Sequence, residues 1–597
     1  MRAHKVLRLM ALAASLLTIS VNPVRGSNGS WPDQVPDIST VDQRFLTQVV
    51  RRTLEARLAG EPPYQVGYAP PSLANVSCQI MVTLRDGGYA RGIGTSELLP
   101  VVDAAQDAAV IALSSARGGE RADLTNLDGI RIEMQALGAL TPYTGTTNWT
   151  IPGALVDFLD PGVHGVRLFL DGEGRWFTPG EMISRGLSID SALVQLGKEV
   201  SLDSRVLNEA KLSRFAAVHW WEVDDAGHVV TLRRGMVPVA QEDVTRRTID
   251  NAIGKLLDYI AYRQRPDGSF ATSFDPTTDR YDKDDDPEMQ AGACWALAEA
   301  ARRGHAQAVD PLARGLKEQQ ARVLELGTDG EAAFLSSGTD RNPLALTAQY
   351  CLALAAEPER AQHAQLRKQL VNAMLWLQRD DGHFLTMFPP STDLDSQERS
   401  PGMALLALAE CYGIAPSADI AEAEAKAFPY YQTLFKKSGA LAMAAWDAQA
   451  FARMADHMRR KDYADFVFAL CDRICAAQLR PDNFADAVLW GAIANDEIAP
   501  SSGTTAFVAA LADAAVLARQ RGDNERAERY TAACHLGVRF ILQLQFKPEE
   551  CYYVRSPSAA VGGIRSAPTN PRLYLDSCQH ALLALMKCRA LLYPDQP

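Results

Sequence analysis

The stretch Arg263–Arg302, RQRPDGSFATSFDPTTDRYDKDDDPEMQAGACWALAEAAR, shows how the C-terminal part of the chain is built. It contains the end of one helical segment, a long polar loop that opens with Gln-x-x-Asp-Gly-x-Phe, and a second helical segment rich in Ala, Cys, Trp and Leu. A related pattern returns at Leu377–Phe384 (LQRDDGHF), again before a polar loop and a helix of small residues. This repetition predicts that residues 245–595 are built from similar helical hairpins.

Helical periodicity extends through the whole of this part. Apolar residues, mostly Ala and Leu, recur at helical spacing in twelve segments. The connections after every second helix are a few residues long, whereas those inside the pairs are mostly long, with one short exception near 437–439. This alternation indicates antiparallel hairpins whose long loops lie at one end. The predicted helices are 245–263, 288–303, 309–326, 342–356, 362–379, 398–413, 419–436, 440–457, 461–478, 503–521, 525–545 and 575–592.

Six such hairpins can close into an (α/α)6 toroid, and an open α-solenoid is the alternative. We expect the Ala-rich second helix of each hairpin to form the inner ring and the more charged first helix to form the outer ring. The inner helices then direct their N-termini toward the long loops. Free N–H groups and partial positive charge at that end favour an anionic or oxygen-rich ligand. Long loops gathered at one end are also where function is usually found.

Residues with suitable chemistry stand near the predicted N-termini of the inner helices, and a closed ring would bring them to one cavity. Paired carboxylates can act as general acid and base, Trp can stack on a sugar ring, and Arg can hold a carboxylate or sulfate. The candidate catalytic residues are Asp282, Asp284, Asp285, Glu398, Asp447, Asp576 and His580. The candidate ligand-binding residues are Arg341, Trp446, Asn483, Trp490, Arg565 and Arg572.

Each candidate residue, taken alone, can also be explained by a purely structural role. Asp286-Pro287 fits an N-cap followed by Pro at the first helical position, and Arg341 can simply pair with a loop acid. Calcium among Asp282–Asp286 is a further alternative, but adjacent acids cannot all point inward. We therefore assign no metal ligand and expect no bound cofactor.

The acidic run also resembles a motif of another toroid class. Asp282-Lys283-Asp284-Asp285 satisfies Asp-x-Asp-Asp, and Gln264-x-x-Asp-Gly-x-Phe resembles the aromatic-ended repeats of squalene and related terpene cyclases. That resemblance implies protonation of an olefin by the central acid in an apolar, aromatic-rich cavity. Here the acids are followed by Asp286-Pro287-Glu288, and aromatic residues make up only 8% of the chain, which disfavours a cyclase.

The residues before about 240 follow a different pattern. Val41–Arg57 has helical spacing, whereas Cys78–Leu84, Gly165–Leu170 and Phe215–Val223 are short β-type runs separated by helical patches. The sequence therefore predicts an α+β domain at residues 27–240 and a toroid domain at residues 241–597.

The order of these segments resembles the AMMECR family, named for the AMME syndrome chromosomal region, over about residues 40–225. The resemblance implies a compact α+β domain whose biochemical activity is not established. The family's Arg-Gly-Cys-Ile-Gly appears here as Arg91-Gly92-Ile93-Gly94, which lacks the cysteine, so we interpret the two glycines as residues of a tight turn. The stretches that carry the likeness are Val82–Gly94, Asp103–Asp107, Ile130–Leu137, Asp160–Gly165 and Phe215–Val223.

Residues 1–26 have the pattern of a secretory signal peptide. A basic start precedes the apolar run Leu9–Val21, and Val24-Arg25-Gly26 offers small residues for cleavage. An uncleaved single-span anchor is the alternative, and no later run is long and apolar enough to span a membrane. The net charge of −12, without a basic block, argues against nucleic acid as a partner. We expect a secreted or periplasmic protein.

The helical half resembles the six-hairpin toroid superfamily of glycoside hydrolases, polysaccharide lyases and sugar epimerases. The likeness lies in helix pattern and motif style over about residues 245–595, so no catalytic residue can be transferred. It implies a carbohydrate or other polar ligand and acid–base chemistry. Whether the protein is an enzyme stays open, because a non-catalytic exported binding or scaffold protein with a protein partner fits the same pattern.

Overall fold

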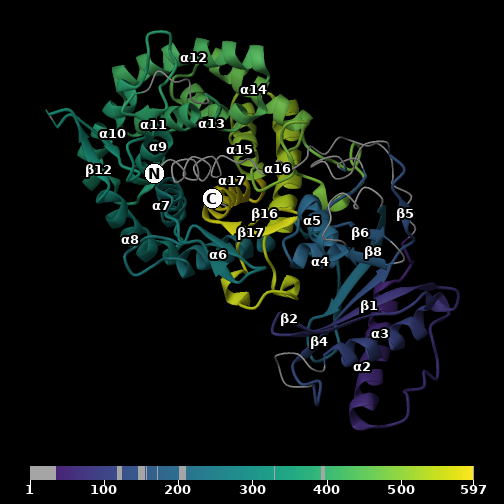
Figure 1. Cartoon of the computed structure of the whole chain (residues 1–597). Coiled ribbons are helices and arrows are strands. Elements are labelled where there is room, and N and C mark those ends of the chain that lie inside the picture. Colours follow the sequence, from purple (N-terminus) through teal and green to yellow (C-terminus); the bar gives the residue numbers. More distant parts are fainter. Residues whose placement is uncertain are drawn as a thin grey trace.

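The computed structural model describes residues 35–116, 124–145, 155, 158–170, 173–200, 210–328, 330–390 and 397–595 (Figure 1). The expected signal peptide, residues 1–26, lies outside this part of the chain. The N-terminal region is α+β, and the C-terminal region is a ring of helices, as expected. No helix within the described residues is long and apolar enough to cross a membrane.

The N-terminal region is an antiparallel sheet with helices packed on it. The main strand order is β2-β1-β4-β8-β6-β7, and β3 pairs with β1 while β5 and β9 pair with β8. Its strands are β1 (Ser77–Asp86), β2 (Tyr89–Thr95), β3 (Leu99–Pro100), β4 (Ile130–Leu137), β5 (Thr141–Pro142), β6 (His164–Leu170), β7 (Glu173–Phe177), β8 (Lys211–Glu222) and β9 (Val229–Leu232). Its helices are α2 (Thr40–Ala59), α3 (Val101–Ser115), α4 (Pro179–Ser184) and α5 (Ile189–Val200).

The glycines of the predicted turn have a different role from the one expected. Gly92 and Gly94 lie inside strand β2, which α3 crosses closely. A Cβ atom on either residue would stand 2.2 Å from a backbone carbonyl of α3, that of Ala112 or Ala108. The interpretation as a tight turn was therefore wrong, because the missing side chains allow a strand and a helix to touch.

The C-terminal region contains all of the predicted helices. Twelve long helices lie within the described residues from 246 to 592, in alternating outer and inner positions. The outer helices are α6 (Arg246–Tyr262), α8 (Val309–Gln320), α10 (Ala364–Trp376), α12 (Ala418–Ser438), α14 (Lys461–Ala476) and α16 (Asn524–Leu544). The inner helices are α7 (Pro287–Arg302), α9 (Leu344–Ala356), α11 (Ser400–Ile414), α13 (Leu441–His457), α15 (Thr504–Gln520) and α17 (Leu575–Leu592).

The inner helices form a closed ring. Each packs against the next, and the last of them, α17, packs against the first, α7. Every residue of α9 is buried, as expected for a helix that has neighbours on all sides. The open solenoid is thereby excluded, and the C-terminal region is an (α/α)6 toroid.

A repeated glutamine joins neighbouring outer helices at four places in the described structure. Each glutamine follows an outer helix, and its Nε2 donates both to the carbonyl of a glycine at φ of 90° to 97° and to a carbonyl of another outer helix. The glycines are needed because a Cβ would stand 2.0 to 2.6 Å from a helix carbonyl. The four donors, with the helix carbonyls that accept, are Gln264 to Pro311, Gln378 to Ala423, Gln478 to Ala533 and Gln545 to Ala252.

We call the end of the ring at which the inner helices begin the mouth. The long loops at the mouth contain short strands. A small sheet of order β11-β10-β17-β16 ends where α17 begins, since β17 stops at Tyr574. The strands of the loops are β10 (Ser273–Asp275), β11 (Arg280–Tyr281), β12 (Val323–Leu326), β13 (Ala332–Leu335), β14 (Asn342–Pro343), β15 (Met387–Phe388), β16 (Arg565–Ala567) and β17 (Asn570–Tyr574).

Candidate functional site

Glu288 in the first turn of α7 is the centre of a polar cluster at the mouth. Helix α7 starts here because Asp286 caps it, accepting hydrogen bonds from the backbone N–H groups of Glu288 at 3.0 Å and Met289 at 3.2 Å. Arg399, which precedes α11, forms an ion pair with Glu288 at 3.0 Å. The amide of Gln349 on α9 donates to the same carboxylate oxygen at 3.2 Å. Three inner helices thus contribute to the position of one carboxylate.

Helix α17 adds a second carboxylate and a histidine to this cluster. Asp576 lies in its first turn, where its side chain accepts a hydrogen bond from the backbone N–H of Ser577 at 2.6 Å. His580 stands one turn further along the same helix. Both side chains are close enough to Arg399 for its charge to influence their ionisation. Because α17 packs against α7, the mouth holds Glu288 and Asp576 at the starts of adjacent helices.

The surroundings shift the ionisation of these three groups. Burial raises the pKa of the Glu288 carboxyl and that of Asp576, although the Arg399 charge acts in the opposite direction. Burial, together with the same charge, lowers the pKa of His580 to about 3. Glu288 nevertheless keeps 26% of its side chain in contact with solvent. The carboxylates therefore lie in a recessed position that a ligand from solution can reach.

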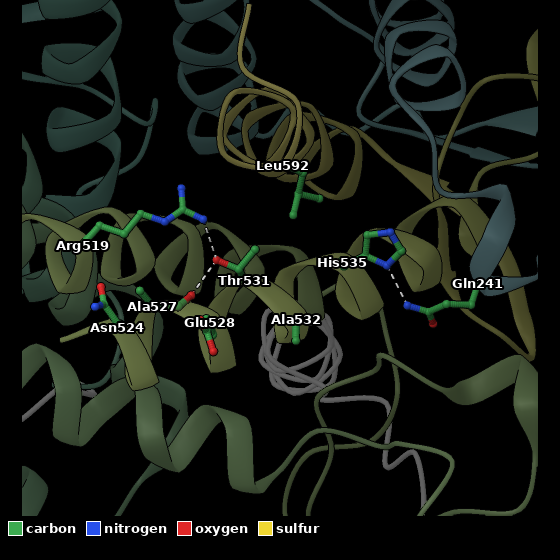
Figure 2. A pocket seen from close by; sticks show the side chains of 9 residues that line it. All are labelled: Gln241, Arg519, Asn524, Ala527, Glu528, Thr531, Ala532, His535 and Leu592. Carbon is green, nitrogen blue, oxygen red and sulfur yellow. Dashed lines mark hydrogen bonds between the residues drawn. The ribbon is translucent and has the colours of Figure 1, made fainter. Parts of the chain in front are cut away.

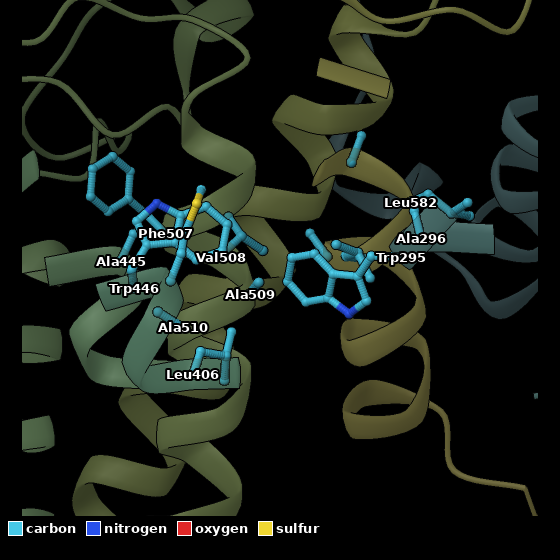
Figure 3. Packing of buried hydrophobic residues seen from close by; sticks show 14 of the residues in the cluster. Trp295, Ala296, Leu406, Ala445, Trp446, Phe507, Val508, Ala509, Ala510 and Leu582 are labelled. Atoms are coloured by element: carbon cyan, nitrogen blue, oxygen red, sulfur yellow. The ribbon is translucent and has the colours of Figure 1, made fainter. Parts of the chain in front are cut away.

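Two tryptophans stand deeper in the ring, below the carboxylates. Trp446 on α13 packs against His580 with ring centroids 5.2 Å apart and against Trp295 on α7 at 6.2 Å. Figure 3 shows both indoles among buried residues of the inner helices, which are small or aliphatic apart from Phe507 among those labelled. Each tryptophan keeps only 5% of its surface exposed, so together they form an aromatic part of the core directly next to the polar cluster.

Two hydrogen-bond acceptors near the tryptophans have no partner. The side-chain oxygens of Gln349 and Gln579 are buried, and neither accepts a hydrogen bond within the described structure. Both side chains lie over Gly292 of α7, where a Cβ would stand 2.2 Å from each of them. Since unpaired buried acceptors are unfavourable, this arrangement favours a donor such as a hydroxyl group or water at this place.

Asp447 faces away from this cluster. It is buried on α13, and its carboxylate is near that of Glu424 on the outer helix α12, so it lies between the two rings. One oxygen of Asp447 and both oxygens of Glu424 lack partners in the described residues. Burial raises the pKa of both carboxyls well above the ordinary range. The structure therefore separates Asp447 from Trp446, its neighbour in sequence.

The predicted acidic loop is mostly engaged in holding itself in place. Asp282 pairs with Arg572 at 2.8 Å and accepts a hydrogen bond from Ser273, and Asp285 pairs with Arg322 at 2.6 Å. Asp284 is exposed, and its backbone carbonyl accepts a hydrogen bond from the Thr272 hydroxyl at 3.0 Å. The loop acids thus have structural partners or face solvent, and Arg572 fixes the loop.

Arg565 is buried in an ion pair with Glu550 at 2.8 Å, which gives it a structural role in place of the predicted ligand contact. Asn483 closes a turn by accepting from the backbone N–H of Arg480 at 2.7 Å. The indole of Trp490 donates to the Phe484 carbonyl at 2.8 Å. These three residues are not brought to the polar cluster.

Two candidates lie on the surface of the loops that lead to inner helices. Arg341 is exposed before α9, and Glu398 is exposed beside Arg399 before α11. Of the predicted residues, the cluster therefore contains Asp576, His580 and Trp446. It also contains Arg399, which the sequence places with Glu398 before an inner helix, and it adds Glu288, Gln349, Gln579 and Trp295, which were not among the predicted residues.

A signal for Glu288 was present in the sequence. It is the second residue of an inner helix, the same position that Asp576 has in α17. In the sequence Glu288 looks like a continuation of the acidic run before it. The structure shows that the loop ends at Asp286, the N-cap, so Glu288 belongs to the helix. Gln349 and Gln579 lie inside inner helices made mostly of small apolar residues. A polar residue at such a buried position was the signal in the sequence that they have a special role.

A pocket of about 730 Å³ lies elsewhere, on the outer wall of the toroid (Figure 2). It runs along α16 from Asn524 to His535 and reaches Leu592 at the far end of α17. His535 hydrogen-bonds Gln241 at 2.6 Å across it. Because the mouth is at the other end of α17, this pocket is separate from the cluster. No group of three or more His, Cys, Asp or Glu side chains within the described residues is arranged to hold a metal ion.

No family model matches the chain, and no curated protein matches it. Among solved structures it is similar to a GH76 alpha-mannanase from Bacteroides thetaiotaomicron, with 10% identity and a TM-score of 0.42 over 57% of this chain and 95% of that chain. It is also similar to cellobiose 2-epimerase from Bacillus thermoamylovorans, with 11% identity and a TM-score of 0.42 over 57% of this chain and 100% of that chain.

The third similar structure covers a smaller part of the chain. It is an uncharacterized protein from Pyrococcus horikoshii, with 18% identity and a TM-score of 0.29 over 33% of this chain and 98% of that chain. All three identities are too low to transfer a residue role from one chain to another. The functional argument therefore rests on the mouth itself.

Proposed function

We propose that the mouth of the toroid binds a carbohydrate and performs acid–base chemistry on it. One observation carries the proposal: Glu288 and Asp576, in the first turns of adjacent helices, are two recessed carboxyl groups under the influence of one Arg399 charge. A raised pKa brings a carboxyl closer to the range in which it can act as a general acid toward a leaving group or a ring carbon. Hydrolysis, elimination and epimerisation of sugars all use such groups.

The surroundings of the carboxylates suit a polyhydroxylated ligand. The tryptophans Trp295 and Trp446 are of the kind that stack on sugar rings, and although both are largely buried, Trp446 packs directly against His580 of the cluster. The amide of Gln349 holds the Glu288 carboxylate, and the buried, unpaired oxygens of Gln349 and Gln579 are suited to a water molecule beside it. Because His580 stays uncharged over the physiological pH range, it can donate or accept a hydrogen bond there, whereas burial and the Arg399 charge disfavour its protonation.

Binding without catalysis is the second candidate. The Glu288 carboxylate is already paired with Arg399 and hydrogen-bonded to Gln349, so it is occupied in the absence of a ligand. A binding or scaffold protein could use the same aromatic residues. Cyclase chemistry has less support, since the Asp284 carboxylate is exposed to solvent and does not lie in an apolar cavity. We further propose that the protein is exported, on the basis of its N-terminal sequence alone.

A panel of neutral and acidic oligosaccharides tests the proposal. The melting temperature of the mature protein is measured with each sugar, and sugars that raise it are incubated and analysed for cleaved or epimerised products. We expect Glu288→Gln and Asp576→Asn to abolish product formation, whereas the control Asp284→Asn retains it. A shift without product in the parent protein supports binding alone, and the absence of any shift removes the carbohydrate proposal.

A further inference from the structure

The N-terminal sheet presents a polar face toward the toroid. Along β4, alternate residues such as Ile132 and Met134 pack beneath α2 and α3, whereas Glu133 points to the other side. Glu133 is flanked by Arg85 of β1 at 2.6 Å and His219 of β8 at 2.9 Å, and all three are buried. Although burial acts to raise it, Arg85 and His219 lower the pKa of Glu133 to about 2. The face is therefore charged yet internally neutralised.

A segment of the toroid, residues 546–564, covers this face. Tyr552 is fully buried, with its ring edge-on to His219 at 5.1 Å and 5.6 Å from the Arg85 guanidinium. Its hydroxyl donates to the carbonyl of Gly180 at 3.4 Å. The indole of Trp221 donates to the carbonyl of Glu549 at 2.8 Å. In Figure 1 the blue N-terminal strands accordingly lie against the yellow end of the ring.

The same segment is tied to the mouth through Glu550. This buried carboxylate accepts a hydrogen bond from the backbone N–H of Val237, which follows the N-terminal sheet, at 3.0 Å. It also pairs with Lys547 at 3.0 Å and with Arg565, the first residue of β16, at 2.8 Å. Strand β16 pairs with β17, and β17 leads directly into α17 and Asp576. A continuous set of contacts thus runs from the sheet to the site.

A second set of bonds fixes the position of β17 from the toroid side. Leu573 and Tyr574 pair with β10, and the N–H of Leu575 donates to Thr272 at 2.9 Å. The N–H of Ile564 donates to the thiol of Cys578 on α17 at 3.4 Å. The start of α17 is therefore positioned by two sets of contacts, of which one is linked to the N-terminal domain through Glu550.

The contacts between the two domains favour a stable interface. Separating the two parts would leave the aromatic ring of Tyr552 and the apolar surface of Trp221 in water, whereas the Glu133–Arg85 and Glu550–Arg565 ion pairs would each stay intact on one side. Arg234 adds a bridge, since it pairs with Asp160 at 2.7 Å and with Asp486 of the toroid at 2.8 Å. Because these buried charges are paired, docking leaves none of them uncompensated in the interface.

We propose that the N-terminal domain is a brace that holds residues 546–574, and through them the start of α17, in the position that the mouth requires. The domain's polar face is used for this contact and not for a ligand of its own. The proposal concerns the position of a segment, so its outcome does not depend on what the mouth binds.

Hydrogen exchange of the full-length mature chain tests this brace. Tyr552→Ala removes the ring between Arg85 and His219, and Glu550→Gln removes the charge that links Val237 to Arg565 while keeping the shape. The matched control is Arg51→Ala, which breaks the Arg51–Glu222 ion pair inside the N-terminal domain, away from the interface. Amide exchange is followed across β17 and the first turns of α17.

In both interface variants we expect exchange at residues 570–580 to become faster by about tenfold or more, with the inner helices α9 and α11 unchanged. The control variant is expected to leave residues 570–580 at the parent rate. Unchanged exchange at 570–580 in a folded Glu550→Gln variant overturns the proposal. An equal increase in the Arg51→Ala control also overturns it, because the effect would then reflect general loss of stability.

Discussion

The side-chain amide of Gln545 donates to the backbone carbonyl of Ala252 at 3.0 Å, and this bond joins the last outer helix of the toroid, α16, to the first, α6. The two residues are separated by 293 positions in the sequence. The same amide also donates to Gly562 at 3.1 Å, so it fixes the long loop that carries the contact with the N-terminal domain. Ring closure and loop position thus depend on one buried side chain.

We predict that Gln545→Ala destabilises the protein by about 1 to 3 kcal/mol, because it leaves the buried carbonyls of Ala252 and Gly562 without a donor. The measurement is urea unfolding followed by circular dichroism. Gln362→Ala is the control, since Gln362 is exposed and bonds only a neighbouring Glu359. We expect the control to change stability by less than about 0.5 kcal/mol. Equal effects of the two substitutions would contradict the role given to Gln545.

Gly562 and Gly304 can be compared to test why the glutamine motif needs a glycine. Their φ angles are 90° and 89°, but only at Gly562 would a Cβ meet a neighbour, the Lys255 carbonyl at 2.6 Å. We predict that Gly304→Ala costs about 1 kcal/mol from backbone conformation alone and that Gly562→Ala costs at least about 1 kcal/mol more. Denaturant midpoints of the two variants measure the difference. If the midpoints coincide, the close approach of loop and helix is not what requires the glycine.

The sequence predicted the helices but only half of this repeated motif. At Gln264 and Gln378 the glycine follows four residues later, which gives a recognisable pattern. At Gln478 and Gln545 it follows after 13 and 17 residues, because an insertion separates two groups that touch in space. Helical periodicity is a local property, so the helices could be predicted, whereas these contacts depend on the closed ring.

The candidate site was predictable to the same limited extent. Residues such as Asp576 and His580 were found because they lie at the start of an inner helix. The ion pair of Asp282 could not be predicted, because its partner, Arg572, is 290 residues away. Trp446 and Asp447 are consecutive, but successive residues of a helix point in different directions, and only the placement of α12 shows that Asp447 faces outward.

The buried carboxyls Glu424 and Asp447 give a prediction about pH. Since burial raises both pKa values, the folded state holds protons that the unfolded state releases above about pH 4, and stability falls as the pH rises from there. We predict that the change in free energy of unfolding caused by Glu424→Gln or Asp447→Asn depends on pH. It should be more favourable at about pH 7 than at about pH 4, by about 1 to 3 kcal/mol. Thermal melts at both pH values measure this.

The control for that experiment is Glu55→Gln, which changes an exposed carboxylate on α2. It is expected to have the same small effect at both pH values. Should the two buried variants lose stability as the pH rises to the same degree as the parent, the unpaired carboxyls are not the source of the pH dependence.

His580 gives a prediction of the opposite sign. Its folded pKa of about 3 lies below the ordinary value of 6.5, so between these values the unfolded state binds a proton that the folded state does not. Stability due to this group is full above pH 6.5 and is lost as the pH falls through that window. We predict that His580→Gln reduces the loss of stability on acidification, measured as the urea midpoint against pH. The exposed His228→Gln serves as the control, and a parallel fall in parent and His580→Gln curves would contradict the assignment.

The central claim, that the mouth is the ligand site, is tested most directly by tryptophan fluorescence. The parent protein is titrated with the oligosaccharide that gives the largest thermal shift, alongside Trp446→Phe and Trp490→Phe. Trp446 stands beside His580 inside the ring, whereas the carbonyl of Trp490 accepts from Arg539 on the outer helix α16 at 2.8 Å. The account predicts that the sugar-dependent change in fluorescence disappears in Trp446→Phe and persists in Trp490→Phe. A change that survives in Trp446→Phe and disappears in Trp490→Phe would place the ligand outside the mouth and contradict the account.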